Sequence, residues 1–274
     1  LFWRSDFLRA RALSGGGAKG AAHVGALLEL DRMGIKFDMV VGTSIGALVG
    51  VGYAALGNVD LLYEYALNLQ NTPLIKRAPS SKEIKPFIKC LGSSMLPASL
   101  PSFLYFWVLN KILKNLRFED LPIQFACTAV NIENGELTVF TQGDILPAVK
   151  ASMAMPGVFK PVKIDGKKYT DGGTLEILPI RTTKRLGADE IVGLKLLSKK
   201  RDYSEVKNSA DAFDRIDGIR ENILQTITES DANIIIELPT EKYKTLDFTQ
   251  TQELIETGRK AVIDKKDEIL EKLR

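Results

Sequence analysis

The chain has 274 residues, of which 45% are hydrophobic and 26% are charged. This composition is typical of globular proteins that bury a large core. The 37 basic residues nearly balance the 34 acidic ones, which argues against a nucleic-acid-binding protein, because such proteins concentrate basic residues on one face. The net charge of +3 permits weak attraction to anionic lipid surfaces. No run reaches the roughly 18 apolar residues of a membrane-spanning helix.

The first ten residues bear on where the domain begins. The cysteines bear on the cellular compartment of the protein. Residues 1–10 contain no initiating methionine and no apolar signal core, so we interpret them as an N-terminal extension or a processing remnant. A single domain is expected over residues 11–274. Cys90 and Cys127 lie in apolar sequence and are predicted to be buried, reduced thiols. We therefore expect a cytoplasmic or peripheral membrane protein, with no transmembrane segment or evident signal peptide.

Short apolar runs alternate with helical patterns along the chain. A strand at 11–14, a helix at 21–34 and a second strand at 37–42 predict one βαβ unit. A further helix is predicted at 45–57. Later apolar runs predict strands at 124–132, 190–197 and 233–239. Near-continuous apolar runs are typical of strands buried on both faces, so we expect an α/β fold with three layers, α/β/α, around a mostly parallel central sheet.

Four further segments have sequence patterns that predict a turn, a helix or irregular structure. An Asn-Gly turn precedes residues 137–144, which are interpreted as part of a hairpin. Residues 250–274 predict one charged amphipathic helix. The most irregular stretches are 71–102 and 198–210, and the second of these is expected to be a solvated loop.

Two glycine-rich turns, Ser14–Gly20 and Gly42–Gly46, stand 27 residues apart. In a right-handed βαβ crossover the two strands are parallel, so both turns emerge at the carboxyl edge of the sheet. If the strands are neighbours, the turns lie about 5 Å apart.

The second turn, GTSIG, fits the GxSxG nucleophile elbow, in which a tight strand-to-helix turn exposes a reactive serine. Here Ser44 is the serine, and Gly42 and Gly46 are the small neighbours that avoid a clash. A strand before the motif and a helix after it supply the required context. The alternative is an ordinary helix N-cap formed by Thr43 or Ser44.

The complementary feature is the triple glycine of Gly15, Gly16 and Gly17. Residues without side chains let backbone N–H groups converge on an anion. A helix that begins near Ala18 would add the positive end of its dipole. The three glycines are therefore candidates for an oxyanion hole beside Ser44. Lys19 is expected to face solvent or an acidic neighbour rather than a reacting carbonyl.

A nucleotide site is the competing interpretation, because Gly15, Gly17 and Gly20 also satisfy the dinucleotide fingerprint GxGxxG. That site needs an acidic residue at the end of the second strand, whereas this strand begins with Asp38 and ends in Gly-Thr-Ser. A Walker-type phosphate loop needs Ser or Thr after its lysine, but Gly20 follows Lys19. Both interpretations are therefore disfavoured.

A nucleophilic serine needs a base, and the chain has one histidine, His23. His23 lies in the first helical pattern and is interpreted as a packing or capping residue. A carboxylate is then required. The candidate is Asp171, where a strand-like KKYT meets the turn Gly172–Gly173, which lets the backbone approach the serine closely. Asp165 is the rival, but its IDGKK context is typical of an ordinary hairpin turn.

Three blocks occur in a specific order: RALSGGGAKGAAHVGALLEL, then VVGTSIGALVG, then KASMAMPGVFKPVKIDGKKYTDGG at 150–173. They resemble the oxyanion-hole, elbow and catalytic-aspartate blocks of the patatin-like phospholipase family. The later ESDANIIIELP and LDFTQTQELIETGRKA resemble that family's closing strand and helix. The resemblance covers nearly all of residues 11–265.

The resemblance implies a patatin-like variant of a serine hydrolase fold in a single catalytic domain, with a Ser44–Asp171 dyad. It also implies hydrolysis of phospholipids or other fatty-acyl esters through an acyl-serine, without a metal or cofactor. The chain has no EF-hand or zinc-ligand spacing, so EDTA resistance is expected. Many members carry Asn before the Leu-Pro pair where this chain has Glu176–Ile177, so the support of the Asp171 loop is expected to differ.

The segment 71–117 is a candidate lid or acyl pocket. It carries Phe103, Phe106 and Trp107 ahead of basic residues, a combination that suits an interfacial lid. The alternative is a helix that covers the core. Two other functions stay open: a carboxylesterase or thioesterase that acts on soluble substrates, and a catalytically silent lipid-binding protein. Peripheral membrane contact is expected for the lipase, and nucleic-acid binding is not.

Overall fold

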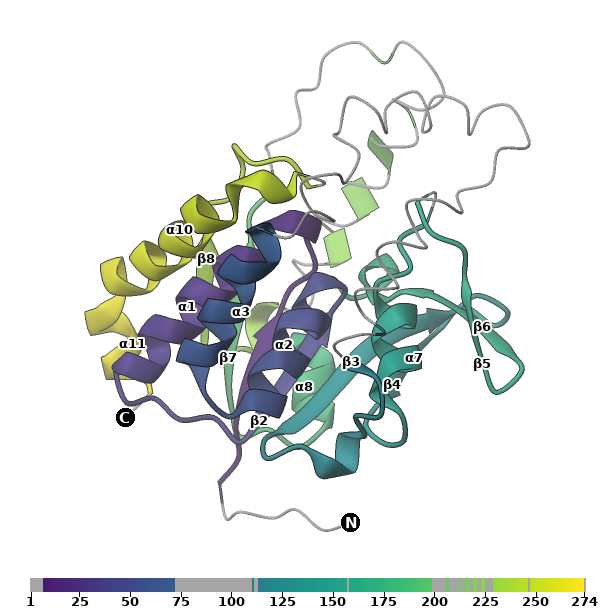
Figure 1. Ribbon diagram of the computed structural model, residues 1–274, viewed down its shortest axis with the longest axis horizontal. Helices are drawn as coiled ribbons and strands as arrows, with labels where there is room; N and C mark the ends of the chain where they lie inside the picture. The colour runs from purple at the N-terminus through teal and green to yellow at the C-terminus, as the bar shows by residue number, and fades with distance from the viewer. Residues whose placement is uncertain are drawn as a thin grey trace.

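The computed structural model describes residues 7–71, 110, 113–156, 158–198, 229–245 and 247–273, with 206, 212, 215, 216, 219, 220, 223 and 224 (Figure 1). Eight strands of this part form one sheet in the order β5-β6-β3-β2-β1-β7-β8, with β4 on β3. The strands are β1 Arg9–Leu13, β2 Met39–Thr43, β3 Gln124–Asn131, β4 Glu136–Phe140, β5 Val162–Ile164, β6 Lys167–Asp171, β7 Glu190–Leu196 and β8 Ile234–Leu238. The strands from β3 through β2, β1 and β7 to β8 pair in parallel, and the others pair antiparallel.

Helices cover both faces of the sheet, which confirms the predicted three-layer α/β architecture. On one face α1, α3 and α10 lie side by side, with α2 next to them over β2 and β3 (Figure 1). The opposite face carries α8 against β1 and β7. The helix bounds are α1 Ala21–Arg32, α2 Ile45–Leu56, α3 Val59–Asn71, α7 Ile145–Ser152, α8 Ile180–Arg185, α10 Thr251–Asp264 and α11 Lys266–Lys272.

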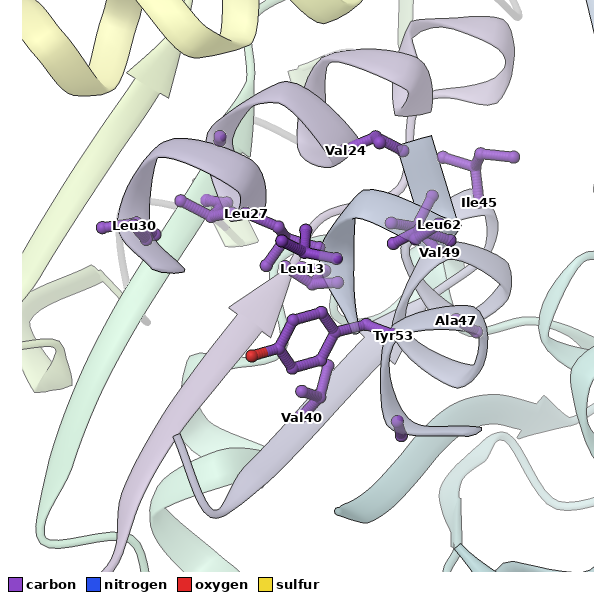
Figure 2. Packing of buried hydrophobic residues seen from close by; sticks show 14 of the residues in the cluster. Leu13, Val24, Leu27, Leu30, Val40, Ile45, Ala47, Val49, Tyr53 and Leu62 are labelled. Atoms are coloured by element: carbon purple, nitrogen blue, oxygen red, sulfur yellow. The ribbon is translucent and has the colours of Figure 1, made fainter. Parts of the chain in front are cut away.

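The two cores follow from the alternation of side chains along β1. Leu13 joins the cluster beneath α1 and α2, whereas Ala10 and Ala12 join the cluster beneath α8. Figure 2 shows side chains of α1, α2, β1 and β2 meeting in the first cluster, where Leu13 and Leu27 are fully buried. A sheet buried on both faces explains why its central strands are rich in apolar residues.

Most expected elements are present, with small shifts in their bounds. β1 begins at Arg9, so the sheet includes the last two residues of the segment that was interpreted as an extension. β3 and β4 form the expected antiparallel hairpin, and Gly135 has the positive φ of 75° that its turn requires. The predicted C-terminal helix is two helices, α10 and α11, separated at Lys265.

Several expectations lie outside the described residues. These are Cys90, nearly all of the irregular stretches 71–102 and 198–210, and the lid residues Phe103, Phe106 and Trp107. Cys127 is described and is a free, fully buried thiol, as predicted. Within the described part of the chain, none of the helices has the length and hydropathy needed to cross a membrane.

Candidate active site

The two glycine-rich turns lie side by side at one edge of the sheet. β1 pairs in parallel with β2, and Leu13 at the end of β1 lies opposite Gly42 near the end of β2. The predicted parallel arrangement is therefore confirmed, and the two strands are also neighbours. A Cβ atom added at Gly15 would lie 3.2 Å from Ser44 Cβ. The first turn thus packs directly against the serine that follows the second strand.

Ser44 has the backbone geometry of a nucleophile elbow. Its φ of 56° and ψ of −123° lie in a region that residues with side chains rarely adopt. A Cβ at Gly42 would overlap the Gly46 carbonyl, and a Cβ at Gly46 would overlap the Leu13 carbonyl. Only glycine at both positions lets the turn close this tightly against β1. Ser44 makes no side-chain capping hydrogen bond to α2, and the Thr43 hydroxyl bonds to Thr128 and Glu176 instead, so the N-cap alternative fails.

A second serine supports the elbow. The Ser44 N–H donates a hydrogen bond of 2.9 Å to Ser152 Oγ, at the end of α7. Ser152 is fully buried. Ser152 lies in the KASMAMP segment that resembles a family block, but sequence patterning alone offered no reason to single it out. Its role depends on α7 packing beside α2, which is a tertiary contact.

The pairing of β3 brings Asp171 to Ser44. β4 occupies one side of β3, and on the other side β3 pairs first with β2 and then with β6. The β2 pairing ends at Thr43, opposite Thr128, and the next residue of β3, Ala129, lies opposite Asp171. Asp171 therefore lies just beyond the end of β2, where Ser44 begins the elbow.

The Asp171 carboxylate is buried, with 4% of the residue exposed. Burial raises its pKa from 3.8 to about 6. A hydrogen bond with the Ser44 side chain and one from the Gly173 N–H, 2.7 Å from Oδ1, stabilise the ionised form and limit the shift. A carboxylate with this pKa is ionised at neutral pH and can still accept a proton.

The backbone around Asp171 is held against β2 and β3. A Cβ at Gly172 would overlap Thr128, so glycine is required for this approach. Thr43 Oγ1 lies 2.7 Å from Thr128 Oγ1 and donates to the Glu176 carbonyl at 3.0 Å. These bonds tie the Asp171 loop to the strand that carries the elbow.

Glu176 and Ile177 occupy the stretch that departs from the family pattern. The buried Glu176 carboxylate accepts hydrogen bonds from the N–H and hydroxyl of Thr182, so it caps the start of α8. Ile177 Cδ1 lies 2.5 Å from a Cβ added at Gly15 and 2.7 Å from one at Gly173. The side chain of Ile177 thus packs between the two loops of the site, a contact that sequence reasoning missed.

The three glycines of the first turn differ in what their N–H groups bind. The Gly15 N–H donates to the Ile177 carbonyl at 2.9 Å, and the Ala18 N–H donates to the Thr245 carbonyl at 2.7 Å. Among the described residues, no backbone carbonyl accepts from the N–H of Gly16 or Gly17. These two groups lie at the N-terminal end of the 3-10 helix Gly17–Gly20, which leads into α1.

His23 and Lys19 are both buried beneath this turn. His23 Nε2 lies 2.9 Å from the Ser14 carbonyl, and burial lowers its pKa to about 4. The ring is neutral at physiological pH and bonded away from Ser44, which agrees with a packing residue. Lys19 does not face solvent, which was one of its two expected environments, and its ammonium donates to the Leu197 carbonyl at 3.2 Å. Asp165 is exposed, in the β5–β6 turn as expected.

Comparisons with known proteins agree with this architecture. Lysophospholipase NTE1 of Meyerozyma guilliermondii is 28% identical over 93% of this chain and 20% of its own length, and that of Candida albicans is 27% identical over 96% and 21%. An NTE family protein of Mycobacterium bovis is 30% identical over 68% of this chain and 48% of its own. The chain thus spans about a fifth of the fungal relatives' length.

Among solved structures, VipD from Legionella pneumophila matches with a TM-score of 0.56 and 14% identity, over 95% of this chain and 67% of that one. At this identity the likeness shows the fold alone. The profile of the family described as patatin-like phospholipase matches residues 12–184, which contain both glycine turns, Ser44 and Asp171. That match covers more than half of the chain, so the chain belongs to the patatin-like phospholipase family.

Proposed function

We propose that this chain is a metal-independent serine acyl hydrolase of the phospholipase A or lysophospholipase type, with Ser44 as nucleophile and Asp171 as base. The observation that carries the proposal is the position of the buried Asp171 carboxylate just beyond the end of β2, where the nearby Ser44 side chain lowers its pKa. Family membership and the fungal relatives named lysophospholipase support a lipid ester as substrate.

In the proposed first half-reaction, ionised Asp171 accepts the Ser44 hydroxyl proton as the Ser44 oxygen attacks the ester carbonyl. The tetrahedral intermediate collapses, the carbonyl–alkoxy bond breaks, and Asp171 returns the proton to the departing alcohol. In the second half-reaction Asp171 takes a proton from water, which attacks the acyl-Ser44 carbonyl. The fatty acid leaves and the proton returns to Ser44.

The proposed oxyanion hole consists of the Gly16 and Gly17 N–H groups. Both lie at the N-terminal end of a helix, where the helix dipole also favours an anion. Gly15 belongs to the turn, but its N–H already binds the Ile177 carbonyl, so we assign it a structural part in the hole. A Cβ at Gly17 would overlap the Thr245 carbonyl, and its φ of 60° favours glycine.

The decisive test measures fatty-acid release from phosphatidylcholine, lysophosphatidylcholine and p-nitrophenyl esters in EDTA. Wild type is compared with Ser44→Ala and Asp171→Asn. We expect release from the lipids by wild type, and loss of at least about a thousandfold in kcat for each variant. The Asp165→Asn variant, which changes an exposed carboxyl in the β5–β6 turn, should retain wild-type activity.

Each other outcome has a distinct meaning. Hydrolysis of the p-nitrophenyl esters alone would favour a carboxylesterase. Inhibition by EDTA would contradict the metal-independent mechanism. A folded Asp171→Asn variant with wild-type turnover would overturn the dyad. If none of the three substrates were hydrolysed and a fluorophosphonate did not label Ser44, a lipid-binding protein would be favoured.

A further inference from the structure

Ser14, the residue before the triple glycine, is held by three hydrogen bonds from different parts of the fold. Its N–H donates to the Leu194 carbonyl at 3.1 Å, and its Oγ accepts from the Leu196 N–H at 2.9 Å. Its carbonyl oxygen lies 2.9 Å from Nε2 of His23. The first two bonds anchor the turn to β7. The third anchors it to α1.

The hydrogen bond between His23 and the Ser14 carbonyl requires one particular tautomer of the imidazole ring. A carbonyl oxygen can only accept, so the proton of the neutral imidazole is on Nε2 and Nδ1 is unprotonated. His23 is fully buried, and no described residue bonds to its Nδ1. A buried acceptor without a partner is destabilising. Packing alone would therefore be served better by an apolar side chain, and the bond to Ser14 explains why a polar ring stands here.

The opposite end of the same peptide is fixed as well. The carbonyl of the Ser14–Gly15 peptide binds His23, and its N–H binds the Ile177 carbonyl. With both polar groups held, the peptide plane cannot rotate. The N–H groups of Gly16 and Gly17 follow directly along the chain, so their directions depend on this plane.

We propose that His23 is a positioning residue for the oxyanion hole: its Nε2–H fixes the Ser14 carbonyl, and thereby aims the Gly16 and Gly17 N–H groups at the substrate oxygen. The inference rests on the proposed function and deepens it. His23 never touches the substrate. His23 orients the Gly16 and Gly17 N–H groups, which bind the transition state more strongly than the substrate. Loss of His23 therefore lowers kcat and leaves KM nearly unchanged.

Two variants separate positioning from packing. His23→Leu fills the same space without a donor and leaves the Ser14 carbonyl buried and unpaired. In His23→Gln the side-chain amide nitrogen can reach the place of Nε2 and restore the donor. Leu27→Ala, one turn along α1, is the matched control: it opens a cavity in the same core but removes no hydrogen bond from the turn.

The measurements are kcat and KM for a p-nitrophenyl ester, the melting temperature, and inhibition by an alkyl trifluoromethyl ketone. That ketone forms a hemiketal with the nucleophilic serine and places an oxyanion in the hole. We expect His23→Leu to lower kcat by roughly 10- to 100-fold, with KM within about threefold, and to weaken ketone inhibition by a similar factor. His23→Gln should recover most of both. Leu27→Ala should lower the melting temperature without these effects.

A folded His23→Leu variant with wild-type kcat and ketone inhibition would overturn the inference and leave the dyad intact. So would a loss of kcat that Leu27→Ala reproduces at equal stability, or a folded His23→Gln variant that recovers nothing. If wild type neither hydrolyses the ester nor is labelled at Ser44 by a fluorophosphonate, the proposed function fails, and this inference fails with it.

Discussion

At the scale of single residues, the ionisation of Asp171 sets the pH dependence of the proposed reaction. Burial raises its pKa to about 6, and the base acts only when it is ionised. We therefore expect kcat/KM for a soluble ester to rise with pH through an apparent pKa near 6 and to level off above about pH 7. His23, whose pKa is about 4, should add no second step in this range. A profile that is flat from about pH 5 to 7 would contradict the assignment.

The same shift predicts a gain in stability when the charge is removed. The folded pKa is above the unfolded value of 3.8, so stability falls as pH rises from about 4 to about 6 and stays reduced above that. A shift of about two units corresponds to about 3 kcal/mol. Asp171→Asn should therefore raise the free energy of unfolding at pH 8 by up to that amount, and should change it little near pH 3.5.

Urea denaturation at the two pH values measures the effect of Asp171→Asn. Asp165→Asn is the control, because its side chain is exposed and should change stability little at either pH. Equal stability of wild type and Asp171→Asn at pH 8 would mean that the carboxylate is not destabilised by burial. A buried carboxylate that lowers the stability of the fold but is needed for activity is common at active sites.

At the scale of helices, glycines let α1 and α10 pack backbone to backbone. A Cβ at Gly25 of α1 would overlap the Ile255 carbonyl, and a Cβ at Gly258 of α10 would overlap the Ala22 carbonyl. Gly258→Ala must separate the two helices, and we expect it to lower the free energy of unfolding by about 1–3 kcal/mol. Because α1 also carries His23, a smaller loss of kcat should accompany it.

Gly52→Ala in α2 is the matched control for the helix-packing prediction. Its added Cβ would meet only the end of the flexible Leu62 side chain, at 2.8 Å. The better helix propensity of alanine should offset the contact, so stability should change by less than about 1 kcal/mol. If Gly258→Ala were as stable as wild type in urea denaturation, the close helix contact would be refuted.

At the scale of the whole molecule, the buried Arg11 joins the sheet to the helical layer. Its guanidinium binds Asp31 of α1 at 2.6 Å and lies over the rings of Phe37 and Tyr53, at 3.7 and 4.5 Å from their centroids. Asp31→Ala would leave this charge buried without a counter-ion. We expect a loss of about 3 kcal/mol, a large part of the stability of a typical domain.

Thermal and urea denaturation measure this loss across the whole fold. Glu256→Gln is the control, because it breaks an exposed ion pair with Arg259 and should cost less than about 1 kcal/mol. If the Asp31→Ala variant were as stable as this control, the prediction would be contradicted. The Arg11 charge would then be stabilised by water or by a partner other than Asp31.

Features that depend on neighbours along the chain could be predicted from the amino-acid sequence. The apolar runs predicted the strands, because strands buried on both faces are rich in apolar residues. GTSIG between a strand and a helix marked Ser44, because the elbow is a local turn. The two glycine turns were predicted to lie at the same edge of the sheet, since the crossover rule makes their strands parallel. The scarcity of histidine directed the search for a base to carboxylates.

Which of these groups meet depends on contacts between elements that are distant in the chain. β6 takes the place of β2 along β3, and that pairing brings Asp171 to Ser44, although the two residues lie more than a hundred positions apart in the chain. The bonds of Ser152 to the Ser44 N–H and of His23 to Ser14, and the burial of Lys19, likewise arise between elements. Local patterns reflect backbone preference and burial, whereas the partner of a buried polar group is set by how helices and strands pack.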